Sequence, residues 1–415
     1  MTVTLEILKN VYGGDGLARL GDGRVCFVAG AFAGETVKAK IFEEKKSFVR
    51  AEMVEILKPS PDRITRIDNA VPGMVYADVT PEAEMEMKRE QLDNFLWKVQ
   101  KSPVPLEVCE LAAEKFLNYR NKAVYHIEKR GNQWYIGYRK EPSHEVVDVE
   151  NDPLVADGIN AAIPSVRSSV MSLLTQGSSE VRKAASANTD VTIRWTRIDG
   201  AHWWMGKPTQ GLTFTEQTAG LKFKVAAGGF YQVNPLVGDD LVKTVRDIYL
   251  EKADRYGDII DLYCGVGVFG IVCAKAAIQS GKSDVRLIGI ESEHKAIDCA
   301  KKNAAQAGVE GKFFCEDVGR NLHRIRISSR HTVIIDPPRG GLEKQVPKWL
   351  ANGYAPRIIY VSCDPATLTR DLMPLSEKYE IKKAVLFNMF PRTARFESVV
   401  VLERKPRRKK DERNV

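Results

Sequence analysis

The sequence predicts a multidomain α/β protein with an N-terminal OB-like β-barrel, an α+β central domain and a C-terminal Rossmann-like domain. Its 415 residues exceed the length of one average domain. Short β-rich runs broken by glycine fill the start of the chain, and strand–helix alternation begins near residue 226. We therefore expect domains at 1–58, 59–225 and 226–403, followed by a basic, disordered tail at 404–415.

The first part consists of runs with strand composition, among them TLEILKNV and RVCFVAGA. Gly-Gly-Asp-Gly at residues 13–16 and Gly-Asp-Gly at residues 21–23 separate such runs. Short strands with turns of this kind are typical of a small barrel. Pro59 and Pro61 lie in the polar stretch that follows and indicate where the barrel ends.

The central part begins with helical periodicity at residues 81–100. β-like runs then alternate with one or two helices expected around residues 153–186. Aromatic and basic side chains are interleaved on the strands: Tyr119, Arg120, Lys122, Tyr138, Arg139 and Lys140. This pattern suits base stacking and phosphate contact, and it equally suits a half-buried sheet with a charged outer face.

Charge and hydropathy narrow the class of protein. The formal net charge is +8, of which +5 falls in residues 404–415, with seven Lys and Arg against two acidic residues. That segment suits either phosphate contact or a solvated tail. No stretch approaches about 18 consecutive apolar residues, so no membrane association is expected. The N-terminus lacks the features of a signal peptide, which indicates a cytoplasmic protein.

The seven cysteines are scattered along the chain, without CxxC pairs or zinc-finger spacings. The default state of each is a reduced thiol. No metal site is predicted, and a special role for one cysteine has to follow from its neighbours.

Residues Asp261–Gly270, DLYCGVGVFG, form the expected turn between a strand and a helix. Gly265 and Gly267 let the backbone approach a ligand closely. Glu291 ends the next expected strand, 24 residues after Gly267, where its carboxylate can accept hydrogen bonds from both hydroxyls of a ribose. This spacing fits a dinucleotide as well as S-adenosylmethionine.

Later strands are expected to end at the same crevice, because ligands of doubly wound sheets bind beyond the carboxyl ends of strands. Asp336 ends the run VIID and precedes Pro-Pro-Arg-Gly, a loop that a hydride-transfer enzyme does not need. Cys363 directly follows a strand and precedes an expected helix, a position that lowers the pKa of a thiol. Glu397, in an expected loop before the last strand, is the best candidate for a general base.

Six motifs occur in order over residues 226–403: FYQVN at 230–234, DLYCGVGVFG, IGIE, DPPRGG, YVSCDPATLTRDL and FPRTARFESVVVLER. Together they resemble the RNA 5-methyluridine methyltransferase family. GGDGLARLGDGRVCFVAGAFAGETV near the N-terminus resembles the family's TRAM domain, an RNA-binding OB-like barrel, and YRNKA at 119–123 resembles its central domain. The resemblance implies a class I methyltransferase domain with S-adenosylmethionine as cofactor.

By this resemblance Cys363 is the nucleophile and Glu397 the base. The rest of the expected site consists of the two glycines of the turn and of positions that match the family's cofactor-binding residues. Together these are Gln232, Tyr263, Gly265, Gly267, Glu291, Asp317 and Asp336. C5 of uracil is a poor nucleophile, but addition of a thiolate to C6 gives an enolate whose C5 can attack a methyl group. The C5 proton then has to leave to a base.

The implied reaction is methylation of uracil C5 in ribosomal RNA of the 23S type, by a monomer that flips the base out of the RNA stack. The long N-terminal segment favours ribosomal RNA, since members that act on transfer RNA often lack it. Transfer RNA stays open as an alternative substrate, and a non-catalytic RNA-binding protein as an alternative function. DPPRGG and SCDP disfavour a dehydrogenase.

The chain departs from the family pattern in two places. Many members hold an iron–sulfur cluster on four cysteines, but Met74 and Asp152 stand where two of these would fall, so no cluster is predicted. Arg395 stands where a histidine is often found, two residues before the base. This leaves the role of Glu397 intact and puts histidine-assisted proton handling in doubt.

Overall fold

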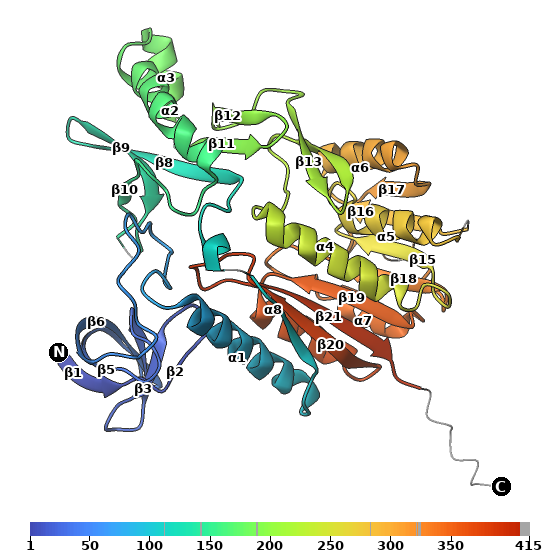
Figure 1. The fold of residues 1–415 in the computed structure, drawn as a ribbon, viewed down its shortest axis with the longest axis horizontal. Helices are drawn as coiled ribbons and strands as arrows, with labels where there is room; N and C mark the ends of the chain where they lie inside the picture. Colours follow the sequence, from blue (N-terminus) through green and yellow to red (C-terminus); the bar gives the residue numbers. More distant parts are fainter. Residues whose placement is uncertain are drawn as a thin grey trace.

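The computed structural model describes residues 1–406 except 112, 142, 188, 189, 283, 321, 323 and 324. Residues 407–415, most of the expected basic tail, lie outside the described residues. Figure 1 shows N-terminal strands at the lower left, a central sheet at the upper left, and a larger sheet with helices at the right. Within the described part of the chain, no helix is long and apolar enough to cross a membrane.

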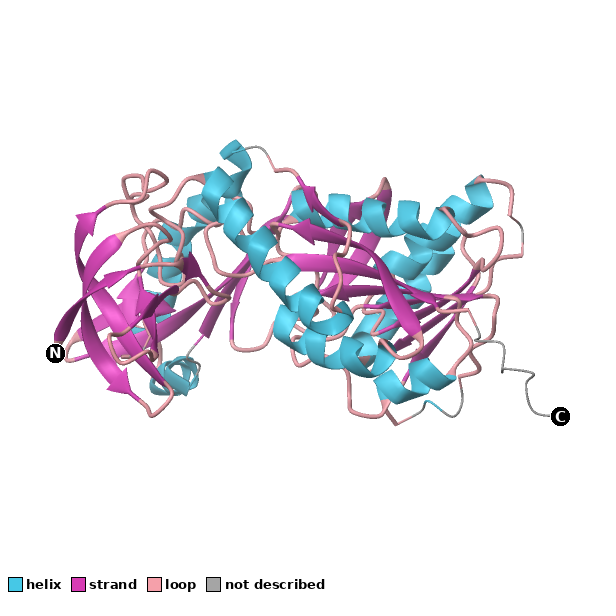
Figure 2. Cartoon of the chain, turned by 90° about the horizontal axis from the view of Figure 1, so that it is seen from below, coloured by secondary structure: helices cyan, strands magenta, loops and turns pink. Residues whose placement is uncertain are grey.

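The N-terminal strands form one sheet, here called the barrel, in the order β1-β5-β6-β4-β3-β2. The strands are β1 (Thr2–Glu6), β2 (Lys9–Asn10), β3 (Gly16–Arg19), β4 (Val25–Ala29), β5 (Thr36–Glu44) and β6 (Phe48–Lys58). Buried and less buried residues alternate along β4, as they do when one face of a strand lies on a core. That core contains Val28, Val37 and Val49, and Figure 2 shows the strands curling around it.

The central part combines a five-stranded sheet, in the order β10-β9-β8-β11-β12, with a helical pair and a separate hairpin. Its elements are α1 (Pro81–Gln100), β7 (Leu106–Cys109), η1 (Ala113–Phe116), β8 (Lys122–Arg130), β9 (Gln133–Arg139), β10 (Val146–Asp148), α2 (Asp157–Thr175), α3 (Ser179–Ala187), β11 (Asp190–Thr196), β12 (Gly200–Met205), β13 (Thr213–Thr218) and β14 (Leu221–Ala226). The helix expected at 81–100 is confirmed, and where one or two helices were expected around 153–186 the structure has two, α2 and α3.

The largest sheet has eight strands in the order β17-β16-β15-β18-β19-β21-β20-β7. Its other elements are α4 (Pro235–Leu250), β15 (Asp258–Leu262), α5 (Val268–Gln279), β16 (Leu287–Glu291), α6 (His294–Ala307), β17 (Gly311–Cys315), β18 (His331–Ile335), α7 (Val346–Asn352), β19 (Arg357–Ser362), α8 (Pro365–Leu375), β20 (Tyr379–Phe387) and β21 (Glu397–Arg404). The strands from β17 to β19 pair in parallel, whereas β21 runs antiparallel to both β19 and β20.

Helices cover both faces of this sheet, which confirms the doubly wound α/β fold. Leu241 of α4 and Ile271 of α5 pack on one face, and Leu92 of α1 and Leu372 of α8 pack on the other. β7 pairs in parallel with β20. The sheet therefore takes its edge strand β7 and its covering helix α1 from a segment that precedes the five-stranded central sheet.

Tyr119 and Tyr138 turn toward the core of the central part rather than toward solvent. Tyr119 is only 5% exposed, and its hydroxyl donates to the carbonyl of Pro391 at 3.0 Å. The hydroxyl of Tyr138 donates to Asp152 at 2.8 Å. Stacking of an RNA base on Tyr119 is thereby excluded, and of this set Arg139 and Lys140 are the exposed members.

Met74 and Asp152, at the positions of the family's cluster cysteines, both lie in the central core. Met74 is 1% exposed, and its sulfur accepts a hydrogen bond from the backbone N–H of Val71. Asp152 is fully buried and accepts from the hydroxyls of Tyr125 and Tyr138. Packing and hydrogen bonding thus occupy both side chains.

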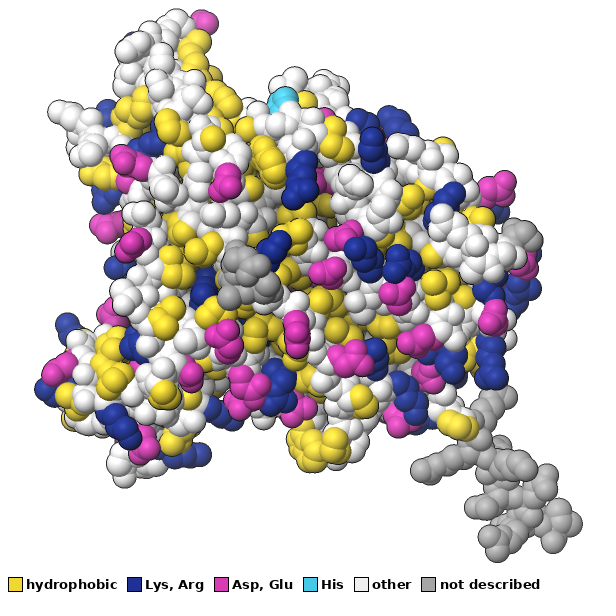
Figure 3. Space-filling view, in the orientation of Figure 1, with side chains coloured by type: hydrophobic (Ala, Val, Ile, Leu, Met, Phe, Trp, Pro, Cys, Tyr) yellow, Lys and Arg dark blue, Asp and Glu magenta, His cyan; other side chains and the backbone are white. Residues whose placement is uncertain are grey.

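Charges are mixed on the surface shown in Figure 3. Lys and Arg side chains are interspersed with Asp and Glu there instead of gathering in one patch. The sequence outside 404–415 has a formal charge of only +3, which is +8 less +5. Phosphate contacts on this face would therefore come from dispersed cations.

Candidate active site

Four side chains expected in the site lie where strands of the large sheet end. Tyr263 follows β15, Glu291 is the last residue of β16, Asp336 follows β18, and Cys363 follows β19. These strands are parallel, so their carboxyl ends lie along one edge of the sheet. The structure therefore brings the four residues to the same edge.

The backbone turn after β15 is open toward a ligand. The angle φ is 60° at Tyr263, 53° at Gly265 and 86° at Gly267, in the left-handed region that glycine adopts most readily. No atom lies within 4 Å of the place where a side chain on Gly265 would begin. The N–H of Gly265 donates to the carboxylate of Glu291 at 3.3 Å, which places Glu291 beside this open backbone.

Asp261 is a further carboxylate of this edge, which the sequence analysis did not single out although it begins the motif DLYCGVGVFG. It is 1% exposed. Its Oδ2 accepts from the N–H of Gly270 at 2.9 Å, and its Oδ1 has no hydrogen-bond partner. Burial, and to a lesser extent the charge of Glu291, raises the pKa of Asp261 to about 7. A buried oxygen without a partner suits a donor on a ligand.

Asp261, Glu291 and Asp336 together make the edge acidic. Burial and the nearby Asp261 carboxylate raise the pKa of Asp336 as well. Carboxyl oxygens at this edge can accept hydrogen bonds from hydroxyl and ammonium donors of a ligand.

The remaining residues expected at the cofactor come from other elements. Gln232 lies between β14 and α4, and its backbone carbonyl accepts from the side-chain amide of Asn121 in the central part. The hydroxyl of Tyr263 donates to Glu343. Burial and that hydrogen bond raise the pKa of Tyr263, and the charge of Asp317 adds to the rise. Asp317, shortly after β17, therefore lies near Tyr263.

The sulfur of Cys363 has acidic surroundings. Cys363 is half-buried and directly precedes Asp364, the N-cap of α8. Burial, followed by the charges of Glu397, Asp336 and Asp364, raises the pKa of Cys363 to about 12. The expected lowering by the helix N-terminus is therefore wrong, because desolvation and three carboxylates outweigh the positive end of α8.

Glu397 is the first residue of β21 and not part of a loop, as the sequence pattern had indicated. It is 3% exposed. Burial and the charge of Asp336 raise its pKa well above the ordinary value. Ser362 of β19 pairs with Ser398 of β21, so Cys363 and Glu397 occupy the next facing positions. A buried carboxyl with a raised pKa beside a thiol is a candidate for proton transfer.

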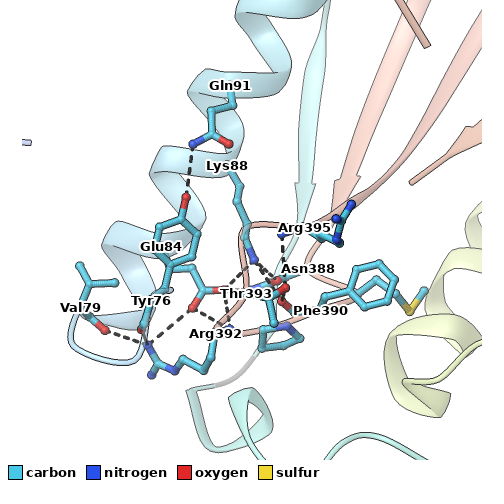
Figure 4. A network of polar contacts seen from close by, with 12 residues as sticks. Tyr76, Val79, Glu84, Lys88, Gln91, Asn388, Phe390, Arg392, Thr393 and Arg395 are labelled. Carbon is cyan, nitrogen blue, oxygen red and sulfur yellow. Dashed lines mark hydrogen bonds and ion pairs between the residues drawn. The ribbon is translucent and has the colours of Figure 1, made fainter. Parts of the chain in front are cut away.

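A buried network holds the segment before Glu397 against α1, as Figure 4 shows. Glu84 of α1 accepts from Lys88 at 2.7 Å, from the amide of Asn388 at 2.9 Å and from the backbone N–H of Arg392 at 3.0 Å. These four residues are at most 5% exposed. The side chain of Arg395, at the place of the family's histidine, points away from Glu84.

Comparison with known sequences assigns both ends of the chain. The profile of the family described as tRNA (uracil-5-)-methyltransferase matches residues 210–405. The profile of the TRAM domain matches residues 1–54, which contain most of the barrel. Residues 210–405 contain all of the expected cofactor-binding and catalytic residues.

Whole-length relatives extend this result. A Streptomyces avermitilis protein described as an uncharacterized RNA methyltransferase is 30% identical, over 96% of this chain and 97% of the relative. A Streptomyces coelicolor protein with the same description is 29% identical, over 96% and 92%. The Pyrococcus abyssi tRNA (uracil-54, C5)-methyltransferase, solved with S-adenosyl-L-homocysteine, has the same fold, with a TM-score of 0.71 at 20% identity over 96% of this chain and 100% of that one. The chain therefore belongs to the family of S-adenosylmethionine-dependent RNA (uracil-5-)-methyltransferases that carry a TRAM domain.

Proposed function

We propose that the chain methylates C5 of uracil in ribosomal RNA of the 23S type, through a covalent bond between the sulfur of Cys363 and C6 of the base. The observation that carries the proposal is the facing placement of Cys363 and Glu397 at the end of the β19–β21 pair. The charges of Asp336 and Glu397 both act on the thiol. A nucleophile and a buried carboxyl that lie close together are the two groups that this chemistry needs.

The acidic edge fits S-adenosylmethionine. The open backbone at Gly265 and the carboxylate of Glu291 suit its ribose, and the partnerless Oδ1 of Asp261 suits one of its donors. The other residues that would surround it are Gln232, Tyr263, Gly267, Asp317 and Asp336. When bound, the cofactor supplies an electrophilic methyl group.

Cys363 acts first. Because its pKa is raised to about 12, its thiol is protonated in the free protein at neutral pH, and the proton has to pass to a neighbouring carboxylate other than Glu397 as the sulfur attacks. The sulfur forms a bond to C6, and the electron pair of the C5–C6 double bond moves toward C5 and the O4 carbonyl. C5 would then take up the methyl group that bound S-adenosylmethionine supplies, and the donor would leave as a neutral thioether.

Glu397 acts second, as a general base that takes the proton from C5. The C5–C6 double bond forms again, the bond between sulfur and C6 breaks, and Cys363 leaves as a thiolate that takes back its proton from the carboxyl group that held it. Glu397 then releases the C5 proton to solvent, so that both groups return to their starting state. The uracil ring has thereby lost one hydrogen at C5 and gained one methyl group. Burial at the start of β21 gives Glu397 a fixed position for this step and keeps bulk water from it.

Transfer RNA is the second candidate substrate, and a specific observation favours it. The profile that matches residues 210–405 and the Pyrococcus abyssi enzyme are both named for transfer RNA. The likeness to that enzyme extends over 96% of this chain. The barrel, on which the expectation of ribosomal RNA depended, therefore does not separate the two substrates.

The test is to map 5-methyluridine in both classes of RNA from a strain that lacks the gene and from the same strain carrying it on a plasmid. We expect one or more uridines of the large ribosomal RNA to lose the methyl group and regain it on complementation. A plasmid encoding Cys363→Ala should not restore it. Loss confined to transfer RNA would favour the second candidate, and unchanged methylation of every uridine would contradict both.

A further inference from the structure

Tyr12 belongs to the barrel by sequence but to the large sheet by packing. It lies in the turn between β2 and β3. The barrel core consists of residues such as Leu5, Val28 and Val49. Tyr12 instead packs against the core that α1, α7 and α8 form with the large sheet. The turn therefore inserts a side chain of the barrel into the catalytic domain.

The contacts of Tyr12 fall on the direct neighbours of both catalytic candidates. Its hydroxyl donates to Oδ2 of Asp364, the residue after Cys363, at 3.4 Å. Its ring meets that of Phe396, the residue before Glu397, edge to face at 5.7 Å. The ring of Phe95 on α1 meets it in the same manner at 6.1 Å. One side chain thus touches the neighbours of the nucleophile and of the base.

Asp364 fixes the backbone on which Cys363 lies. Its Oδ1 accepts from the N–H groups of Ala366 and Thr367, each at 3.0 Å, and its own N–H donates to the hydroxyl of Ser362. The second carboxylate oxygen is the one that Tyr12 reaches. Burial and the charge of Asp364 raise the pKa of Tyr12, so its hydroxyl keeps its proton and remains a donor.

The turn that presents Tyr12 is itself held in place. The N–H of Val11 donates to the carbonyl of Asp15 at 2.9 Å, and the N–H of Gly14 donates to the carbonyl of Val11 at 3.0 Å. A side chain on Gly14 would begin 2.8 Å from Val75, so this glycine lies directly on that residue. The position of Tyr12 is therefore coupled to the barrel and to the segment that follows it.

We propose that Tyr12 is a positioning residue of the methyl-transfer reaction, which acts through Asp364 and Phe396 to set how Cys363 and Glu397 face each other. The barrel then forms part of the active centre in addition to any contact it makes with RNA. This inference rests on the proposed roles of Cys363 and Glu397, and it assigns Tyr12 no contact with the base or the cofactor.

Kinetics of Tyr12→Phe test the proposal, because this variant keeps the ring and removes only the donor. We expect kcat to fall about fivefold, the value of one ordinary hydrogen bond, with KM for RNA within about twofold of the wild type. Tyr12→Leu, which also removes the edge-to-face contact, should lose more. Phe42→Leu is the matched control, because Phe42 is an aromatic residue of the barrel that is 60% exposed.

Alkylation of Cys363 by iodoacetamide, followed by peptide mass spectrometry across pH, provides a readout that needs no turnover. The charged groups that face Cys363 and Tyr12 are Asp336, Asp364, Glu397, Arg339 and Arg395. Loss of the Tyr12 donor leaves more negative charge on Asp364, so the alkylation profile of Cys363 should move to higher pH in Tyr12→Phe. Cys315, which is exposed, is the internal reference and should not change.

The proposal holds when kcat falls and the Cys363 profile moves while Cys315 stays the same. It is overturned when kcat is unchanged, when only KM rises, or when the Cys363 profile stays in place. A wild-type protein that forms no adduct with RNA containing 5-fluorouridine would instead refute the proposed function. The alkylation comparison would then still decide whether Tyr12 positions Cys363.

Discussion

Cys363 and Glu397 face each other at the end of the antiparallel β19–β21 pair, one position beyond the pairing of Ser362 with Ser398. The register thus brings residues 34 positions apart in sequence near each other, and the charge of Glu397 acts on the thiol. Burial and the charge of Glu397 raise the pKa of the thiol, whereas burial and the charge of Asp336 raise that of the Glu397 carboxyl.

Removal of the nucleophile should abolish methyl transfer and leave the cofactor site intact. We expect Cys363→Ala to lose methyl transfer by at least about a thousandfold, since no other group can form the bond to C6. Its affinity for S-adenosylmethionine, measured by calorimetry, should stay within about threefold. Cys315→Ala is the control, because Cys315 is the exposed thiol and should keep wild-type activity. Turnover by Cys363→Ala would rule out covalent catalysis.

Glu397→Gln should stop the reaction after the methyl group has reached C5. The adduct between Cys363 and the base cannot then lose its C5 proton, and it accumulates as a protein–RNA species visible on a denaturing gel. Turnover should fall by about 10²–10⁴-fold, the usual contribution of a general base. Rapid turnover without accumulation would show that another group takes the proton.

We expect the buried carboxyl of Asp261 to lower the free energy of unfolding of the cofactor-free protein as the pH becomes alkaline. Its pKa in the folded protein is raised to about 7, whereas the ordinary value is 3.8. Between these values the folded state binds the proton more tightly than the unfolded state, so this contribution to stability is present at low pH and disappears as pH rises through about 7. Asp261→Asn should therefore stabilise the cofactor-free protein by up to about 4 kcal/mol at pH 8 and far less at pH 4.5, in urea unfolding. An equal effect at both pH values would contradict this assignment.

The buried ion pair Glu84–Lys88 of α1 should contribute far more to stability than the exposed pair Glu86–Arg89 on the same stretch of the helix. Lys88→Met removes the nearer of two buried cations that pair with Glu84, at 2.7 Å, and leaves only the guanidinium of Arg392 at 3.5 Å. Breaking a buried ion pair typically costs about 3–5 kcal/mol in unfolding free energy. Arg89→Met removes the partner of Glu86 in an exposed pair, which is worth less than about 1 kcal/mol. Similar midpoints for the two variants in denaturant unfolding would mean that Lys88 does not stabilise the network.

Much of the fold could be predicted from patterns that act over short stretches. Strand–helix alternation located β15 to β19, and the glycine turn after β15 has the left-handed backbone at Gly265 and Gly267 that this motif requires. The positions of Glu291, Asp336 and Cys363 at one edge followed from the rule for parallel strands. These features depend on local sequence and on a general property of doubly wound sheets.

Other features depend on contacts between distant segments, which periodicity does not reveal. The pairing of β7 with β20 and the contact of Tyr12 with Asp364 each join residues hundreds of positions apart. The pKa of Cys363 was expected to fall, because its place before α8 was visible in the sequence whereas the carboxylates around it were not. Glu397 was expected in a loop, because the start of β21 depends on the pairing of Glu397 with Phe387 of β20, which the local sequence does not reveal.

The most direct test of the central claim is to incubate the purified protein with S-adenosylmethionine and an RNA substrate in which 5-fluorouridine replaces uridine. Fluorine at C5 cannot leave as a proton, so the account predicts a stable covalent complex with a methylated base attached to the peptide that contains Cys363. Cys363→Ala should form none. Absence of a complex with the wild type on RNA that it methylates, or attachment to any residue other than Cys363, would contradict the account.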